Sequence, residues 1–374
     1  MKAIQTPRAK PHFHWTHAIS IMFHFSLLQK GAAFSVYRHS GSRSAKKAST
    51  SDFIHRFLSS STSNNHDETK TILVPDMTGW TVDRVVTESI AQLQAQNVIE
   101  PESSVSQLLA ASLQLSWKTG YREIASSSVK SRTLEQDQAK EYADKLSRRL
   151  QHEPLQYILG QWDFLDYTVK IRPPLLCPRP ETEELVMRIV QDTTESPIHI
   201  LDVGCGTGVI GLALAEQLPD AFVQAIDIDP VAIETSLENA MIVLGNRDYA
   251  TSCYQATLCS AQDYDGGNHK FDIVVSNPPY IPKADMETLS RDVVEYESES
   301  ALCGGDDGMD IVRVICEKLP TWCHPSGICW MEVDPTHPKL LKEWLDENPS
   351  VGVVFEDSYQ DMFGNDRFVK LRVV

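Results

Sequence analysis

From residue 198 onward the sequence alternates between short apolar runs and longer amphipathic stretches, and this alternation constrains the fold more than any other feature. The apolar runs are rich in β-branched residues, which is typical of interior strands of a parallel sheet. The expected strands are residues 198–204, 222–229, 249–255, 271–276, 327–333, 351–357 and 366–373. The expected helices are residues 207–218, 230–245, 309–319 and 338–348. This alternation predicts an α/β fold with an open, doubly wound sheet that binds ligands at the carboxyl ends of its strands.

A glycine-rich turn, DVGCGTG at residues 202–208, follows the first of these strands. Gly204, Gly206 and Gly208 allow the backbone to turn sharply and to approach a ligand closely. Their G-x-G-x-G spacing differs from the G-x-G-x-x-G of the dinucleotide-binding fingerprint, which makes NAD the less favoured ligand. Asp227 ends the next strand, a position from which a carboxylate reaches the hydroxyls of a ribose. The turn and the carboxylate together predict a nucleoside ligand.

A second candidate site follows the strand at 271–276, where the sequence continues Asn277, Pro278, Pro279 and Tyr280. The prolines stop the strand and stiffen the loop, and Asn277 is biased to extended backbone because it precedes a proline. The Asn277 oxygen and the Pro278 carbonyl can accept the two N–H bonds of a planar nitrogen, with Tyr280 on its flat face. Such a cradle favours charge that develops on nitrogen in a transition state. An ordinary proline turn is the structural alternative, and S-adenosylmethionine is the ligand consistent with both sites.

The charge of the chain is unevenly distributed. Residues 1–51 hold eight Lys or Arg and no acidic residue, so the rest of the chain carries a formal charge of −25 against −17 for the whole. A basic, serine-rich, acid-free start is typical of an organellar transit peptide, with a disordered basic tail as the alternative. The apolar stretch 19–28 is too short to span a membrane. The acidic remainder argues against a protein that grips a nucleic-acid backbone.

The eight cysteines form no C-x-x-C pair and have no histidine at zinc-ligand spacing. We therefore expect reduced, buried thiols, with neither a disulfide framework nor a metal site. The abundance of thiols also disfavours a secretory signal as the explanation of the N-terminal segment.

Apolar residues at helical spacing predict helices at residues 82–93, 105–115 and 134–150. Their polar faces are either a plain solvated surface or a substrate-recognition surface. The alternation of Tyr167, Val169 and Ile171 with polar residues then predicts a strand or hairpin.

The sequence PRPETE places Arg179, Glu181 and Glu183 immediately before an apolar helical face. Glutamates in a first helical turn complement the helix dipole, which is the structural explanation. The functional alternative is that this segment forms a loop over the substrate cleft.

Several of these motifs together resemble the release-factor glutamine N5-methyltransferases of the HemK/PrmC family. The similar segments are EPLQYILG, PRPETEELV, LDVGCGTG, VVSNPPYI, GGDDGMD and GNDR, within a match that runs from about Trp80 to the C-terminus. The resemblance implies a Rossmann-like methyltransferase domain whose last strand is antiparallel, preceded by a helical domain and a hairpin linker. It also implies methyl transfer from S-adenosylmethionine to the glutamine of the GGQ loop in a class I peptide-chain release factor.

The resemblance assigns roles to individual residues. Those assigned to S-adenosylmethionine are Asp202, Gly204, Cys205, Gly206, Thr207, Gly208, Asp227, Thr257, Leu258 and Asn277, where Thr257 and Leu258 occupy the place of an acidic–aromatic pair near the adenine. Those assigned to the substrate are Asn277, Pro278, Pro279, Tyr280, Arg179 and Glu181. Catalytic roles are expected for Asn277, Pro278 and Tyr280, which would bind and orient the glutamine amide.

The expected organisation is a transit peptide and linker at 1–70, a helical substrate-recognition domain at 71–152, a hairpin linker at 153–178 and a methyltransferase domain at 179–374. We expect a mitochondrial monomer, with the plastid as the alternative location, and neither a membrane nor nucleic acid as a direct partner. An adenine N6-methyltransferase is a second hypothesis, but it would need a basic groove. An inactive methyltransferase-like assembly factor is a third, disfavoured by the intact glycine turn and NPPY sequence.

Overall fold

The computed structural model of the chain describes residues 74–116, 119–194, 196, 198–245, 247–267 and 269–374. The expected transit peptide and linker at 1–70 lie outside these residues. Among the described helices, none has both the length and the apolar character needed to cross a membrane. No cluster of His, Cys, Asp and Glu suited to a metal ion occurs in the described part of the chain.

A bundle of helices forms the first described region. Its helices are α3 (Val82–Ala95), α4 (Pro101–Ser112), α5 (Gly120–Glu123), α6 (Ser127–Lys130), α7 (Gln136–Leu150) and α8 (Leu155–Leu159). The hydroxyl of Thr81 caps α3 by accepting a hydrogen bond from the backbone N–H of Arg84. Apolar residues at helical spacing, among them Val85, Leu108 and Leu146, are fully buried in one core. The three long helices expected from the sequence are confirmed, whereas α5, α6 and α8 were not predicted.

A short antiparallel hairpin follows the bundle. It consists of β1 (Gln161–Phe164) and β2 (Tyr167–Lys170), with Trp162 opposite Val169. Gly160 ends α8 in the left-handed conformation that glycine adopts without strain. The hairpin expected from the alternating residues is therefore confirmed.

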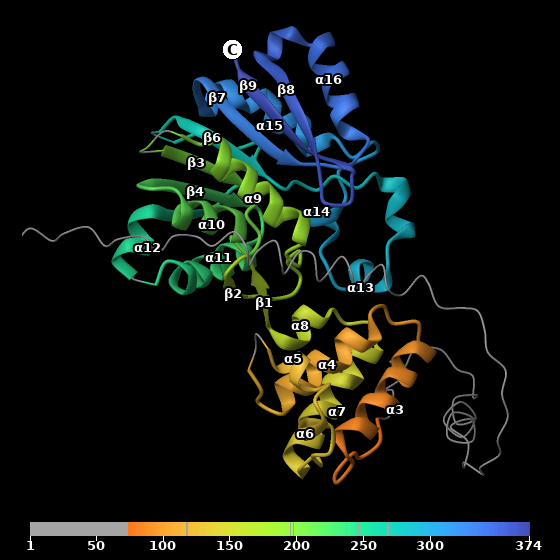
Figure 1. Ribbon diagram of the computed structural model, residues 1–374. Coiled ribbons are helices and arrows are strands. Elements are labelled where there is room, and N and C mark those ends of the chain that lie inside the picture. Colours follow the sequence, from red (N-terminus) through yellow and green to blue (C-terminus); the bar gives the residue numbers. More distant parts are fainter. Residues whose placement is uncertain (1–73, 117–118, 195, 197, 246, 268) are drawn as a thin grey trace, which may run out of the picture. The chain divides into compact units, whose positions relative to one another are not determined.

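A seven-stranded sheet forms the second region (Figure 1). In spatial order its strands are β5 (Tyr254–Leu258), β4 (Ala221–Asp227), β3 (Ile198–Val203), β6 (Phe271–Ser276), β7 (Cys323–Glu332), β9 (Asp366–Val373) and β8 (Val353–Gln360). Pairing is parallel from β5 to β7, while β9 is antiparallel to both of its neighbours. The expected open, mostly parallel sheet with an antiparallel last strand is confirmed.

Helices cover both faces of this sheet (Figure 1). The helices α9 (Pro180–Asp192), α10 (Val209–Gln217) and α11 (Pro230–Val243) pack on one face, and α15 (Asp310–Trp322) and α16 (His337–Glu347) pack on the other. Successive strand residues point to opposite faces. Accordingly Ile200 joins the first apolar core and Leu201 joins the second.

The strand expected at 249–255 is wrong over most of its length. Residues Arg247–Cys253 form the helix α12, and the strand β5 begins only at Tyr254. Ala250 and Cys253 are buried three residues apart, which is a helical and not a strand spacing. Short helical elements that were not predicted also follow β6 and α16: η1 (Lys283–Thr288), α13 (Arg291–Val294), α14 (Glu299–Leu302) and η2 (Pro349–Val351).

One buried arginine connects the helical bundle to the segment after β6. Arg149 donates to the backbone carbonyls of Ile99 and Glu153 and to the hydroxyl of Ser104. Its guanidinium also forms an ion pair with Asp292 of α13, at 2.9 Å. Both side chains of this pair are almost completely buried. A buried guanidinium is tolerated only when its N–H donors are hydrogen-bonded and its charge is paired, and Arg149 meets both conditions.

Candidate active site

Strand register brings the two candidate sites to the same edge of the sheet. Val203, the last residue of β3, lies opposite Ser276, the last residue of β6, in a parallel pair. Val203 also lies opposite Ile226 of β4, and Asp227 lies opposite Leu258 of β5. One carboxyl edge of the sheet therefore carries the glycine turn, Asp227, Leu258 and the loop at residues 277–280, called the Asn277 loop below. A doubly wound fold binds its ligands at this edge.

The glycine turn is held open toward this edge. Gly204, Gly206 and Gly208 all have positive φ, at 72°, 53° and 83°. A Cβ added at Gly204 or Gly206 would meet nothing within 4 Å, whereas one at Gly208 would lie 2.8 Å from the Cβ of Ser236. The first two glycines thus border open space, and the third is required by close packing against α11.

Asp227 organises the turn with both carboxylate oxygens. Its Oδ2 accepts from the backbone N–H of Gly206 at 2.8 Å, and its Oδ1 accepts from that of Asp229 at 2.9 Å. Burial raises the pKa of Asp227, and these backbone donors oppose the rise. Since each carboxylate oxygen has a second lone pair, Asp227 can still accept further hydrogen bonds.

Asp202 lies deeper than its predicted role suggests. The side chain is fully buried, and its Oδ2 accepts from the backbone N–H of Gly211 in α10 at 3.0 Å. Its Oδ1 is buried without a hydrogen-bond partner among the described residues. Burial and, to a smaller extent, the charge of Asp227 together raise the pKa of Asp202 to about 7. Asp202 therefore supports the first turns of α10.

The other predicted cofactor residues differ in exposure. Cys205 and Thr207 are buried, and the backbone carbonyl of Thr207 accepts from the side chain of Asn239. Thr257 is exposed and accepts from Gln224 at 3.0 Å. Leu258 is 56% exposed.

Ile228 was not predicted as a site residue, yet it lies next to Asp227 at the same edge and is 59% exposed. Ile228 was expected within a strand at 222–229, but β4 ends one residue before it, at Asp227.

The Asn277 side chain has a defined orientation. Its Nδ2 donates to the hydroxyl of Thr182 at 3.4 Å, and that hydroxyl donates to Oε2 of Glu332 at 2.8 Å. The hydroxyl of Tyr280 donates to Oε1 of the same glutamate at 3.3 Å. Thr182 and Glu332 were not predicted as site residues. No donor among the described residues reaches the Asn277 Oδ1 or the carbonyl of Pro278.

The segment GGDDGMD, residues 304–310, packs against this loop and is hydrogen-bonded to the residue that follows it. Ile281 donates to the carbonyl of Leu302, and Gly304 donates back to the carbonyl of Ile281, both at 2.9 Å. A Cβ on Gly304 would lie 2.6 Å from the backbone oxygen of Pro279. The glycine is therefore required where two backbone segments touch.

Arg179, predicted to bind substrate, forms an ion pair with Glu297 at 2.8 Å. The Glu297 side chain is almost fully buried, and burial raises its pKa while Arg179 opposes the rise. Glu181 is half-buried. The guanidinium of Arg179 thus compensates a buried carboxylate in the segment before α14, a use that its sequence position did not reveal.

Two further acidic residues of the same motif hold separate parts of the fold. Glu183 accepts from the backbone N–H of Leu165 in the turn between β1 and β2, at 2.8 Å. Glu184 accepts from the backbone N–H of Met362, beyond β8, at 2.9 Å. The helix-dipole explanation of these glutamates is therefore incomplete, because their carboxylates also anchor neighbouring loops to α9.

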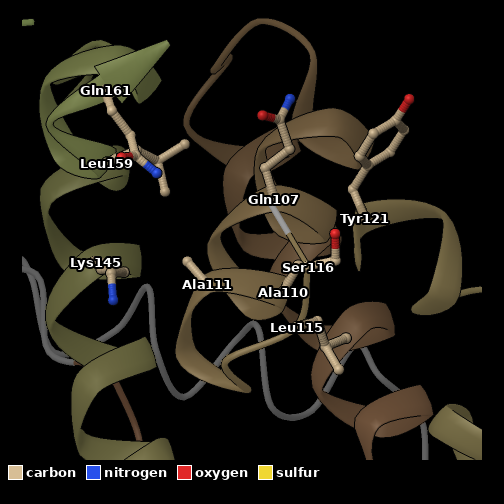
Figure 2. A pocket seen from close by; sticks show the side chains of 9 residues that line it. All are labelled: Gln107, Ala110, Ala111, Leu115, Ser116, Tyr121, Lys145, Leu159 and Gln161. Atoms are coloured by element: carbon tan, nitrogen blue, oxygen red, sulfur yellow. The ribbon is translucent and has the colours of Figure 1, made fainter. Parts of the chain in front are cut away.

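The described residues also form a separate cavity of about 260 Å³ in the helical bundle (Figure 2). In this view Leu159 and Gln161 lie on one side of it, with Gln107 and Tyr121 on the other. Its lining contains no residue of the glycine turn or of the Asn277 loop.

Comparison with known proteins gives two family matches. Residues 182–304 match the family described as methyltransferase small domain, and residues 84–160 match the PrmC N-terminal domain. Among solved structures, a methyltransferase from Pyrococcus furiosus covers 56% of this chain and 90% of its own, with 16% identity and a TM-score of 0.39. A likeness this remote carries no weight here.

Curated relatives are much more similar. The human MTRF1L release factor glutamine methyltransferase is 39% identical over 236 residues, which cover 60% of this chain and 69% of the relative. A release factor glutamine methyltransferase from Geobacter sulfurreducens is 38% identical over 50% of this chain and 63% of its own length. One from Streptococcus pneumoniae is 34% identical over 62% of this chain and 80% of its own. This chain belongs to the family of release factor glutamine methyltransferases.

Proposed function

We propose that this chain transfers a methyl group from S-adenosylmethionine to the side-chain amide nitrogen, N5, of the glutamine in the GGQ motif of a class I release factor. The observation that carries the proposal is the orientation of Asn277. Its NH2 group donates to Thr182, so its Oδ1 is left as an acceptor, and the Pro278 carbonyl likewise accepts from no donor among the described residues.

These two acceptors match the two N–H bonds of a primary amide. An amide nitrogen is a poor nucleophile because its lone pair is delocalised into the carbonyl group. Acceptors fixed on its hydrogens favour the positive charge that develops as the nitrogen attacks, which is electrostatic preorganisation toward the transition state. The Tyr280 hydroxyl donates to Glu332, and this hydrogen bond restricts the orientation of the tyrosine ring.

S-adenosylmethionine would supply the methyl group: the new bond from nitrogen to carbon forms as the carbon–sulfur bond breaks, sulfur keeps that electron pair, and one N–H proton is released. The residues at the carboxyl edge fit such a molecule. Gly204 and Gly206 border open space, and Asp227 retains free lone pairs for ribose hydroxyls. Ile228 and Leu258 expose apolar side chains that a planar adenine would cover.

Replacing Asp227 with alanine is expected to weaken S-adenosylmethionine binding by about 1.5–3 kcal/mol, or about ten- to a hundredfold in Kd, because charge-assisted hydrogen bonds to the ribose are lost. Isothermal titration calorimetry measures this directly. Asp229→Ala is the matched control, since it removes the neighbouring carboxylate that caps α11. Unchanged affinity in a folded Asp227→Ala protein would refute the assignment.

The activity itself is tested by incubating the purified protein with labelled cofactor and a class I release factor, followed by mass spectrometry of the peptide that contains GGQ. We expect one methyl group on the glutamine side chain, and none on a factor whose GGQ glutamine is replaced by alanine. Methylation of adenine in an oligonucleotide, with the release factor unmodified, would instead support the second hypothesis. Absence of transfer to either would support the third.

We also infer a mitochondrial location, on the ground that residues 1–51 are basic, serine-rich and free of acidic residues. A fusion of residues 1–60 to a fluorescent protein is expected to enter mitochondria. Accumulation in plastids would favour the alternative organelle, and diffuse cytosolic fluorescence would contradict both.

A further inference from the structure

The hydrogen bonds behind Asn277 have a fixed direction. A threonine hydroxyl has a single proton, and the proton of Thr182 points to Glu332. Its oxygen can then only accept from Asn277, so the NH2 group of the Asn277 carboxamide must face Thr182. An ionised Glu332 enforces this direction because a carboxylate accepts and never donates.

Glu332 is placed to keep that direction. Its side chain is 1% exposed, and its two oxygens accept from Thr182 and from Tyr280. One carboxylate at the end of β7 thus orients both the amide and the aromatic residue of the Asn277 loop. The donors come from α9 and from the segment after β6, so the arrangement depends on contacts far apart in the sequence.

We propose that Glu332 and Thr182 are positioning residues for methyl transfer: through Thr182, Glu332 turns the Asn277 carboxamide so that its oxygen faces the substrate amide. This inference rests on the proposed function and deepens it. Neither residue touches the reacting atoms, and both act through Asn277 and Tyr280.

The protonation state of Glu332 should then be visible in the rate. Burial raises its pKa to about 7. Among the groups that face it, the charge of Glu181 also raises this pKa, whereas Thr182, Tyr280 and Arg367 lower it. Below this pH a protonated Glu332 can donate to Thr182, whose own proton can then turn toward Asn277 and reverse the carboxamide. Transfer should therefore increase as the pH rises through about 7.

The first test is Thr182→Val, which keeps the shape of the side chain and removes the hydroxyl. We expect kcat for methyl transfer to the release factor to fall about tenfold, the scale for one lost hydrogen bond, with the S-adenosylmethionine Kd and the KM for the factor unchanged. Thr193→Val, at the C-cap of the same helix, is the matched control, because its hydroxyl donates to the backbone carbonyl of Ile189. A wild-type kcat for Thr182→Val would overturn the proposal.

The second test is Glu332→Gln, whose amide can donate to Thr182 at any pH. We expect a similarly reduced kcat and the loss of the increase through pH 7 that the wild type shows. Glu184→Gln is the control, since Glu184 is also a buried acid but bonds to the backbone of Met362. An increase through pH 7 that persists in Glu332→Gln, or that is absent from the wild type, would contradict the role given to Glu332.

The third test separates positioning from general damage to the fold. In an Asn277→Ala background, Thr182→Val should lower transfer no further, because the residue through which it acts is gone. An additional tenfold loss would show that Thr182 acts by another route. Wild-type transfer in the same assay establishes the proposed function independently, so a failure of this inference is distinguishable from a failure of that function.

Discussion

Asn277→Ala is expected to lower the single-turnover rate of methyl transfer to a GGQ-containing release factor by about two to three orders of magnitude, the scale for losing one preorganised polar contact. The substitution removes the oxygen that would accept from the substrate amide, and it also leaves Thr182 without the donor that it accepts from. The protein should stay folded and bind S-adenosylmethionine as before, since the hydrogen bond of the Asn277 side chain goes to Thr182, whereas Asp227 bonds to the glycine turn. Rapid-quench measurement at saturating cofactor separates chemistry from binding.

Asn277→Asp sharpens this prediction. It retains an acceptor oxygen but replaces the NH2 donor with a second acceptor, which the Thr182 hydroxyl cannot satisfy while its proton points to Glu332. We therefore expect the aspartate variant to be nearly as slow as the alanine variant. Asn348→Ala is the control for removing an amide elsewhere, because Asn348 follows α16 and its side chain donates to the backbone carbonyl of Trp344. Near-wild-type transfer by a folded Asn277→Ala enzyme would defeat the proposed mechanism.

Gly304→Ala is expected to lower methyl transfer by about a hundredfold, the scale for displacing a reacting group by about 1 Å. The added Cβ would lie 2.6 Å from the backbone oxygen of Pro279 and would also collide with the carbonyl of Gly308. The nearest atoms on both sides of this Cβ belong to the backbone, so no flexible side chain can move away to make room. The Asn277 loop must therefore shift. Cofactor affinity should change little.

Single-turnover transfer and calorimetry on the same Gly304→Ala preparation check this expectation. Gly79→Ala is the control, because Gly79 also lies in a turn but a Cβ there meets nothing within 4 Å. That control should cost only the strain of a left-handed backbone. A Gly304→Ala protein with the transfer rate of the wild type would mean that the loop tolerates the displacement.

Features encoded by neighbouring residues were predictable from the sequence. The glycine turn, the acid that ends β4 and the proline loop after β6 all follow from local rules on backbone conformation, and their common edge follows from parallel pairing. The secondary structure of the amphipathic segment before β5 was harder to predict, because a short run containing Tyr249 and Cys253 is compatible with either helix or strand. In the structure Ala250 and Cys253 are both buried, and their spacing of three residues is that of a helix.

What local rules cannot provide is the partner of a polar side chain. Thr182 and Glu332 bond across 150 positions of sequence, and neither stands in a pattern that indicates the other. The ion pair of Arg179 was not predictable for the same reason, since the sequence gives no sign that Glu297 would be buried beside it. Pairings of this kind depend on which loops the finished sheet brings together.

The buried pair of Arg149 and Asp292 limits how this enzyme can be recombined. A chimera whose helical bundle lacked the arginine would keep Asp292 buried without its guanidinium, and stranding one member of a buried ion pair costs about 3–5 kcal/mol. For the same reason, a chimera that borrows its helical bundle from a relative must inherit an arginine at this position together with the aspartate.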